Sequence, residues 1–354
     1  MKILFTGATG ILGSHILLSL LLNNEVYLLV RNAAQRLENL TGLGVPPHHI
    51  FECDLEKNNL ALSDDAISRL KSIGLDLILH VAASVKFDEK HYQRTLNINK
   101  DGTERLIRLG KFLKIRNIHF VSTAYAPFQR NPYERSKLDA ENSVINSGLA
   151  YNIYRPGVIV GESKTCAIKG FNGFYGYVMV PYFIVQSLKK NRSSSVELPI
   201  NIPCSFTSTI NIIPVDWVVS QIVSLINLGT FNEIYHITNP QPPLSSWLLK
   251  VIYDYLNIYG INYVDWETYF NSKNGNGKSL LQRLFDKQTE IFSPYIKGEE
   301  IFDISSTKNR LCKQYKDPGI VTELWVHGLI DYAIKNNFGR QTRSSGMNEA
   351  KSIS

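Results

Sequence analysis

Three glycines spaced three residues apart follow the first apolar run of the chain. The run covers Met1–Phe5, and Thr6–Gly13 reads Thr-Gly-Ala-Thr-Gly-Ile-Leu-Gly. In a strand–turn–helix unit the first glycine makes a tight turn, the second lets the backbone approach a pyrophosphate, and the third lets the helix pack on the sheet. Gly7, Gly10 and Gly13 stand in these three places. The motif therefore predicts a dinucleotide-binding turn at the start of a parallel sheet.

Short β-rich runs alternate with amphipathic segments through the first 160 residues. The expected strands are Lys2–Phe5, Glu25–Val30, His49–Cys53, Leu75–Val81, Asn117–Ser122 and Tyr151–Arg155. The expected helices are Ile11–Asn23, Asp64–Ile73, Lys100–Leu113 and Pro132–Ser147. This alternation is typical of the α/β class with a Rossmann-type, doubly wound parallel sheet. Ligands of such sheets bind outside the carboxyl ends of the strands, where the glycine turn, Ser122-Thr123 and Arg155-Pro156-Gly157 fall.

The pattern changes after Gly161 to aromatic-rich stretches, prolines and irregular loops. We expect an NADP(H)-binding Rossmann domain at 1–160 and a smaller, mostly helical substrate-binding region at 161–338, with a polar, disordered tail at 339–354. The two regions are expected to interleave, because two segments near 210–240 have the composition of strands that return to the sheet. These expected strands are Ile210–Pro214 and Ile234–Thr238, and the expected helices are Ser245–Tyr259 and Val321–Asn336.

A tyrosine and a lysine lie four residues apart in Tyr133-Glu-Arg-Ser-Lys137. Four residues make roughly one helical turn, so both side chains lie on one face of the expected helix. Ser122-Thr123 lies one strand-to-helix step upstream. We expect Tyr133 to donate a proton to a carbonyl oxygen that Thr123 also hydrogen-bonds. Lys137 would hold the cofactor ribose and, with the cofactor ring, lower the pKa of the phenol from its usual ~10. The set predicts a reductase.

The residue that follows the second expected strand indicates which dinucleotide binds. An acidic side chain at this place binds the ribose hydroxyls, whereas a basic one suits a 2′-phosphate. Arg31 follows Val26–Val30 with no Asp or Glu nearby in the sequence, which favours NADPH over NADH. Arg36 is either a second phosphate contact or a solvated helix residue. Asp54 is either an adenine contact or a helix N-cap.

Composition excludes several other classes of protein. The 354 residues are 44% hydrophobic, enough for a globular core, and the longest apolar stretch, Ile16–Leu22, is far short of the ~20 residues that cross a bilayer. We expect a soluble, cytoplasmic protein without a membrane span. The four cysteines have no metal-ligand spacing, and His80 is expected to be a satisfied core histidine. The net charge of +7 has no long basic run, so nucleic acid is not the expected partner. Either the charge suits a polyanionic ligand or it only keeps the protein soluble.

The chain resembles the extended short-chain dehydrogenase/reductases over nearly its whole length. Within them it looks most like the thioester reductases, which are the terminal reductase domains of nonribosomal peptide and polyketide synthetases, carboxylic acid reductases and fatty acyl-CoA reductases. The segments that carry the resemblance are Thr6–Gly13, Leu29–Arg31, Asp54-Leu55 with Leu60–Ser63, His80–Ala83, Asn99–Thr103, Val121–Tyr125, Tyr133–Lys137, Arg155–Gly161 and Pro214–Asp216. The Asp-Leu…Leu-Ser segment and the run Arg155–Thr165 are the most typical of thioester reductases.

The resemblance implies NADPH-dependent reduction of an acyl thioester to an aldehyde, or onward to an alcohol. Because Met1 begins the first strand, we expect the thioester to arrive on a separate carrier protein or on coenzyme A. The implied catalytic residues are Thr123, Tyr133 and Lys137. The implied cofactor contacts are Gly7, Thr9, Gly10, Ile11, Leu12, Arg31, Asp54, Leu55, Ala82, Ala83, Ser122, Tyr133, Lys137, Pro156 and Val158. No metal site is expected.

The substrate half differs from the family pattern. Only nine residues separate Thr123 from Tyr133, where relatives carry a longer substrate-contacting loop. The aromatic stretch Phe171–Phe183 either lines an acyl tunnel or packs in the core, and core packing is the more common fate of a single ring. Two other functions remain open. One is a sugar-nucleotide epimerase, dehydratase or ketone reductase on the same fold, and the other is a non-catalytic dinucleotide-sensing protein.

Overall fold

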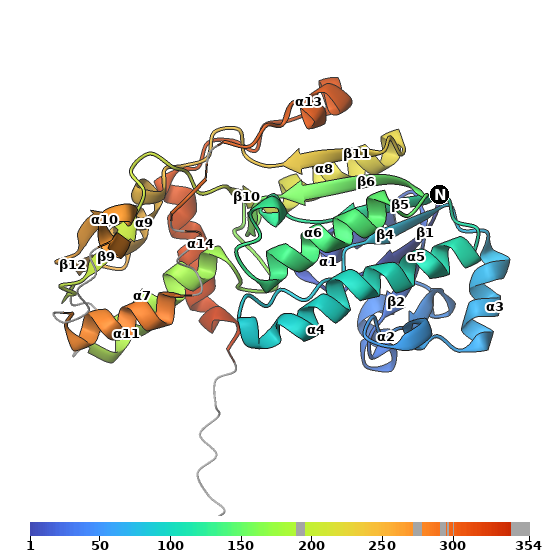
Figure 1. Ribbon diagram of the computed structural model, residues 1–354, viewed down its shortest axis with the longest axis horizontal. Helices are drawn as coiled ribbons and strands as arrows, with labels where there is room; N and C mark the ends of the chain where they lie inside the picture. The colour runs from blue at the N-terminus through green and yellow to red at the C-terminus, as the bar shows by residue number, and fades with distance from the viewer. Residues whose placement is uncertain (189–194, 272–277, 291–294, 296, 300, 341–354) are drawn as a thin grey trace, which may run out of the picture.

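A seven-stranded, all-parallel sheet is the largest element of the computed structural model, which describes residues 1–188, 195–271, 278–290, 295, 297–299 and 301–340 (Figure 1). The strands lie in the order β11-β6-β5-β4-β1-β2-β3. Their bounds are β1 Lys2–Thr6, β2 Glu25–Val30, β3 Ile50–Glu52, β4 Leu77–His80, β5 Asn117–Val121, β6 Ala150–Pro156 and β11 Glu233–Ile237. The order reverses between β1 and β4, so the helices after these strands diverge and leave a crevice at the carboxyl ends.

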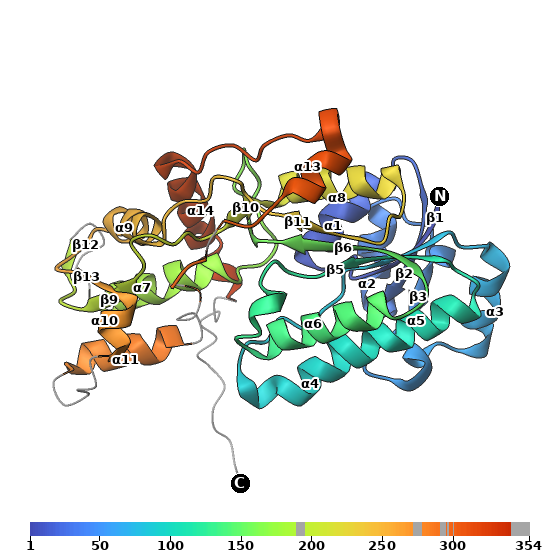
Figure 2. The ribbon, with the colours of Figure 1, turned by 45° about the horizontal axis from the view of Figure 1, so that its top comes forward.

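Alternate residues of each strand pack on opposite faces of the sheet. In β1, Ile3 and Phe5 join one apolar cluster and Leu4 joins the other. The first face is covered by α1 (Ile11–Leu20), α2 (Ala33–Gly42) and α8 (Val215–Leu228). The second is covered by α3 (Asp64–Ile73), α5 (Gly102–Phe112) and α6 (Pro132–Ile145), and α4 (Tyr92–Leu96) leads into α5 through a π-helical turn (Figure 2). Because both faces are buried, the strands are mostly apolar.

Capping residues fix where the helices begin. The side chain of Asn131 accepts a hydrogen bond from the backbone N–H of Glu134 at 3.0 Å, and Pro132 occupies the first turn of α6. Ser63 caps α3 in the same way through the N–H of Ala66 at 3.1 Å. These contacts satisfy N–H groups that the helix itself cannot pair. The start of α6, which carries Tyr133, is therefore well defined.

A C-terminal lobe packs beside the sheet around its own apolar cluster (Figures 1 and 2). Its helices are α7 (Phe174–Leu188), α9 (Ser245–Tyr255), α10 (Trp266–Asn271), α11 (Leu280–Thr289) and α14 (Glu323–Lys335). Short parallel pairs join β8 (Val196–Glu197) to β12 (Ile258–Tyr259), β9 (Asn201–Cys204) to β13 (Asn262–Asp265), and β7 (Val158–Val160) to β10 (Ile212–Pro214). The helix α13 (Ser305–Leu311) returns to lie beside β11.

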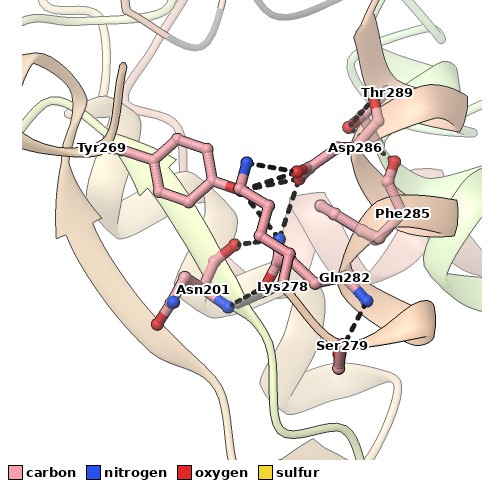
Figure 3. Close-up of polar contacts among 8 residues, drawn as sticks. All are labelled: Asn201, Tyr269, Lys278, Ser279, Gln282, Phe285, Asp286 and Thr289. Carbon is pink, nitrogen blue, oxygen red and sulfur yellow. Dashed lines mark hydrogen bonds and ion pairs between the residues drawn. The ribbon is translucent and has the colours of Figure 1, made fainter. Parts of the chain in front are cut away.

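One polar cluster joins three elements of this lobe (Figure 3). The Asp286 carboxylate on α11 accepts hydrogen bonds from the Tyr269 hydroxyl and from the Lys278 ammonium, all at 2.8 Å. Gln282 on the same helix exchanges two hydrogen bonds with the backbone of Asn201 in β9, at 2.7 and 3.0 Å. Every polar group of the cluster therefore has a partner in another segment, and we interpret it as the anchor of α11 to the rest of the lobe.

The structure confirms the Rossmann-type sheet and its six expected N-terminal strands, and β11 returns to the sheet as predicted. The expectation for Ile210–Pro214 was wrong, because β10 pairs with β7 and not with the seven-stranded sheet. The expected helix Ser245–Tyr259 ends at Tyr255, where Ile258–Tyr259 forms β12. Residues 341–354 of the expected disordered tail lie outside the described residues, and the domain boundary at residue 160 stays a prediction. Among the described residues, no helix has both the length and the apolar character needed to cross a membrane.

Candidate active site

A cavity of about 740 Å³ opens along the carboxyl ends of the parallel strands. One end is formed by the glycine turn and the segments that follow β2 and β3, and the middle by residues that follow β4, β5 and β6. The far end is formed by α7 and by Tyr295 and Glu299 of the C-terminal lobe. All of the residues proposed from the sequence as catalytic or cofactor-contacting line this one cavity, whereas Arg36 does not.

The glycine turn forms a cradle with no space for side chains. Gly7 has φ +86°, and a Cβ there would collide with the backbone nitrogen of Ala82. A Cβ on Gly13 would collide with the carbonyl oxygen of Gly7. Gly10 precedes α1 and gives it no side-chain cap, so the N-terminus of α1 faces the cavity with its backbone N–H groups. A helix N-terminus of this kind fits the pyrophosphate of a dinucleotide.

Two carboxylates approach the segment that follows β2. The Glu56 carboxylate lies 3.8 Å from Arg31 and 2.9 Å from Arg94, and all three side chains line the cavity. The Glu52 carboxylate accepts hydrogen bonds from the backbone N–H groups of Asn32 and Ala33 at 2.9 and 2.6 Å. The sequence showed no acidic residue near Arg31, but β3 brings two. Arg31 therefore has a competing anion beside it, and Arg94, not Arg36, is the second cation on this wall.

Asp54 lies on the cavity wall at the end of β3. Its carboxylate accepts the backbone N–H of Glu56 at 2.9 Å, so it caps the loop that follows β3 and not the N-terminus of a helix. Leu55 is beside it on the wall. The side chain therefore fixes the loop that holds Glu56 and still borders the end of the cavity near Arg31.

A buried asparagine connects the middle of the cavity to α6. The Asn99 amide accepts the backbone N–H of Ser84 at 2.7 Å, donates to the Ser84 carbonyl at 3.0 Å and donates to the Ser136 hydroxyl at 2.9 Å. Ser136 lies on α6 between Tyr133 and Lys137. The segment after β4, which includes Ala82 and Ala83, is thereby fixed relative to the helix that carries the proposed catalytic pair.

Thr123, Tyr133 and Lys137 lie on the wall where β5 ends and α6 begins. The Lys137 ammonium is buried, donates to the Val121 carbonyl at 2.5 Å and lies 3.9 Å from the ring centroid of Phe120. Burial lowers the pKa of Lys137 to about 7, against the opposing effect of Glu141. Burial, with Glu134 and Glu141 adding to it, raises the pKa of Tyr133. The expected lowering of the phenol pKa is therefore not produced by the protein groups alone.

The end of the cavity at the C-terminal lobe is aromatic. From the stretch Phe171–Phe183, Phe174 and Tyr177 line the cavity, whereas Tyr175 is fully buried in the core of the C-terminal lobe. Phe174 and Tyr177 belong to the same apolar cluster as Tyr175, so core packing holds for all three rings, and an acyl tunnel stays a prediction. Tyr125 comes from the short segment between Thr123 and Tyr133 and also lines the cavity.

Many residues of this wall were not proposed from the sequence, and the charged and aromatic ones among them include Glu56, Arg94, Tyr125, Tyr295 and Glu299. Glu56 carried a usable signal, since it lies two residues after Asp54. Tyr125 ends the motif segment Val121–Tyr125, whereas Arg94, Tyr295 and Glu299 carried no signal, because folding brings them to the cavity from segments without a motif. The described residues contain no group of three or more His, Cys, Asp or Glu side chains arranged to hold a metal ion.

Together the cavity has an anion-binding turn, a hydroxyl, phenol and lysine set, and an aromatic end. A phenol and a hydroxyl directed at one carbonyl oxygen suit proton donation and oxyanion stabilisation. The buried surroundings strengthen such hydrogen bonds. This arrangement suits the reduction of a carbonyl group next to a bound dinucleotide.

Comparisons with known proteins agree with this chemistry. The model of the family described as "Male sterility protein" matches residues 5–131 and 126–222. Nonribosomal peptide synthetase asaC of Aspergillus flavus is 26% identical over 319 residues, which are 75% of this chain and 29% of that protein. Fatty acyl-CoA reductase wat of Drosophila melanogaster is 32% identical over 145 residues, which are 35% of this chain and 28% of that protein. The matches thus cover less than a third of the length of either relative.

A solved structure shares the fold over almost the whole chain. It is the terminal R domain from the myxalamid PKS-NRPS biosynthetic pathway, with a TM-score of 0.73 and 22% identity, covering 95% of this chain and 91% of that one. At this identity the likeness concerns the fold alone. This likeness of fold includes the C-terminal lobe, where the sequence motifs are weakest.

Proposed function

The chain belongs to the family described as "Male sterility protein", and from this membership we propose that it is an NADPH-dependent reductase of acyl thioesters. The substrate would be bound to coenzyme A, as the name of the Drosophila relative states for that enzyme, or to a separate carrier protein. The product would be the aldehyde, or the alcohol after a second reduction. The observation that carries the proposal is the continuous cavity from the glycine turn past Tyr133 to the rings of α7.

The cofactor contacts proposed from the sequence all lie on the cavity wall. We infer that Gly7, Thr9, Gly10, Ile11 and Leu12 hold the pyrophosphate, Arg31 the 2′-phosphate, and Asp54 and Leu55 the adenine side. Ala82, Ala83, Ser122, Pro156 and Val158 would border the nicotinamide half. When bound, NADPH supplies a hydride for the thioester carbonyl carbon.

The residues of the chain act on the carbonyl oxygen. The Tyr133 hydroxyl would donate its proton there, and the Thr123 hydroxyl would donate a hydrogen bond to the same oxygen. The resulting hemithioacetal loses its thiol and leaves the aldehyde. Lys137 would bind the ribose, and its protonated form would favour the tyrosinate that remains.

The test is NADPH oxidation by the full chain with three panels of substrate. The first panel contains acyl thioesters of coenzyme A and of N-acetylcysteamine, the second free ketones, and the third UDP-sugars. We expect turnover with thioesters and release of a free thiol. Turnover confined to ketones or UDP-sugars would show that the same fold performs the alternative reaction, and binding of NADPH without any turnover would favour a non-catalytic sensor.

A further inference from the structure

Glu299 brings a carboxylate from the C-terminal lobe into the substrate end of the cavity. Its backbone pairs with Thr209 through two hydrogen bonds of 2.9 Å, and the Thr209 hydroxyl adds a third at 3.0 Å to the same carbonyl. Its side chain is only 5% exposed and lines the cavity. Backbone pairing therefore fixes the position of the Glu299 carboxylate. A side chain on an exposed loop would not be held in this way.

One guanidinium serves two carboxylates at this place. Arg130 donates to Glu134 through its Nε at 3.1 Å, its Nη2 at 2.8 Å and its backbone N–H at 2.8 Å. Its Nη1 donates to Glu299 at 2.7 Å. Glu134 is fully buried, so it is the first carboxylate that Arg130 must neutralise. When Glu299 is also ionised, these three groups carry one net negative charge at the cavity wall.

The rings around this charge suit a cation, and the Arg130 guanidinium already lies over two of them, 5.2 Å from the Tyr125 ring centroid and 4.2 Å from that of Tyr295. The Tyr125 ring centroid lies 5.6 Å from that of Tyr295, and Tyr177 also lines this end of the cavity. The Tyr125 hydroxyl is buried and has no hydrogen-bond partner among the described residues. Aromatic faces and a carboxylate attract ammonium groups, and an unpaired hydroxyl can accept a hydrogen bond from one.

We propose that the substrate end of the cavity takes an acyl chain with a protonated amine, which binds the Glu299 carboxylate and the Tyr125 hydroxyl. The proposal deepens the proposed function, because it names the class of acyl thioester. A plain hydrocarbon would leave the one net negative charge of Arg130, Glu134 and Glu299 unbalanced in a buried place, which is costly, whereas an ammonium restores charge balance.

The spacing of the rings favours an amine remote from the carbonyl. The Phe87 ring centroid lies 5.9 Å from that of Tyr133 and 5.6 Å from that of Tyr295, so a ring separates the proton donor from the carboxylate end. An ω-aminoacyl chain fits this separation better than an α-amino acid.

The activity test compares 6-aminohexanoyl and hexanoyl thioesters of N-acetylcysteamine. We expect kcat/KM to be at least about tenfold higher for the amino compound, and Glu299→Gln to remove most of that preference. Tyr125→Phe deletes only the unpaired hydroxyl and should lower the preference by a smaller factor. Glu89→Gln is the matched control, because Glu89 also pairs with an arginine, Arg135, but is exposed and does not line the cavity. If Glu299→Gln lowered kcat/KM by the same factor for both thioesters, the proposal would be contradicted.

The preference should also depend on pH. Burial raises the pKa of Glu299 to about 7, with Glu134 adding to it and Arg130 opposing it. The groups that face Glu299 are Arg130, Glu134 and the phenols of Tyr125 and Tyr177, and burial raises the pKa of both phenols. The ratio of the two kcat/KM values should therefore rise between pH 6 and 8 in the wild type and stay flat in Glu299→Gln.

A binding measurement separates this inference from the proposed function. Calorimetric titration of the full chain with n-hexylammonium and with n-hexanol needs no turnover. Tighter binding of the ammonium in the wild type and not in Glu299→Gln would support the cation site even if no thioester is reduced. Equal affinity for the two probes in the wild type would overturn the inference even if thioesters are reduced.

Discussion

At the scale of single residues, the phenol of Tyr133 is the group on which the proposed chemistry depends. Tyr133→Phe keeps the ring and its contact with Phe87 but removes the proton donor. We expect NADPH affinity to be retained and single-turnover reduction of an acyl thioester to slow by about 10²–10⁴. Tyr259→Phe is the control, since this tyrosine is half-exposed and away from the cavity. Full activity of Tyr133→Phe would mean that the proton comes from another group.

Arg31 and Glu56 set the charge at the end of the cavity where we propose that the adenosine of NADPH binds. Arg31→Asp removes a charge-assisted contact of ~1.5–3 kcal/mol, so the Kd for NADPH should rise by at least about tenfold. Glu56→Gln should lower that Kd by up to about fivefold, because an exposed pair contributes ~1 kcal/mol or less. Fluorescence titration measures the Kd for NADPH in both variants. The control Arg36→Asp should change this Kd little, because Arg36 does not line the cavity. An unchanged Kd in Arg31→Asp would show that another residue binds the phosphate.

At the scale of elements, the turn between β1 and α1 tolerates no side chain. Gly7 and Gly44 both have positive φ, but a Cβ on Gly44 meets nothing, whereas one on Gly7 meets the backbone after β4. We expect Gly44→Ala to lower the free energy of unfolding by about 1–2 kcal/mol. Gly7→Ala should lower it by at least about 3 kcal/mol and abolish NADPH binding. Urea unfolding measures the free energy of unfolding, and titration measures NADPH affinity. Equal losses of both quantities in Gly7→Ala and Gly44→Ala would contradict the role given to the glycine turn.

Burial decides which elements of this chain can be predicted from its sequence. The strands of the large sheet could be predicted because helices cover both faces, which leaves apolar runs such as β4 with no exposed residue. The helix α2 was not predicted, and it buries only Leu40. The pairing of β10 could not be predicted either, since a three-residue strand carries no information on its neighbour.

At the scale of the whole molecule, the two ends of the cavity differ in how far their residues could be predicted from the sequence. The end at the glycine turn depends on local motifs, such as the glycine turn and the Tyr133–Lys137 helix, so residues that line it could be named from the sequence. The substrate end depends on the packing of the C-terminal lobe against the sheet. Arg130 and Glu299 are 169 residues apart in the chain, and no local pattern predicts that they pair.

Two buried histidines make the stability of the whole molecule depend on pH. His80 bonds Thr6 and Thr103 through its two ring nitrogens, at 2.6 and 3.0 Å. This agrees with the expectation of a satisfied core histidine. His119 bonds Thr230 and Tyr154 in the same way, both at 2.8 Å. Burial lowers the pKa of each from 6.5 to about 3, with Lys137 adding to the effect at His80.

Between pH 6.5 and about 3, the unfolded chain therefore binds two protons that the folded protein does not bind. The free energy of unfolding consequently falls as the pH is lowered through this range. Each histidine contributes up to ~1.4 kcal/mol per pH unit to the slope. His119→Gln should lower stability at neutral pH, because it disturbs two buried hydrogen bonds, but it should also reduce the slope by about one proton. Urea unfolding across pH 4–7 measures the slope, with His48→Gln as the exposed control. An unchanged slope in His119→Gln would show that His119 takes up a proton in the folded protein as readily as in the unfolded chain.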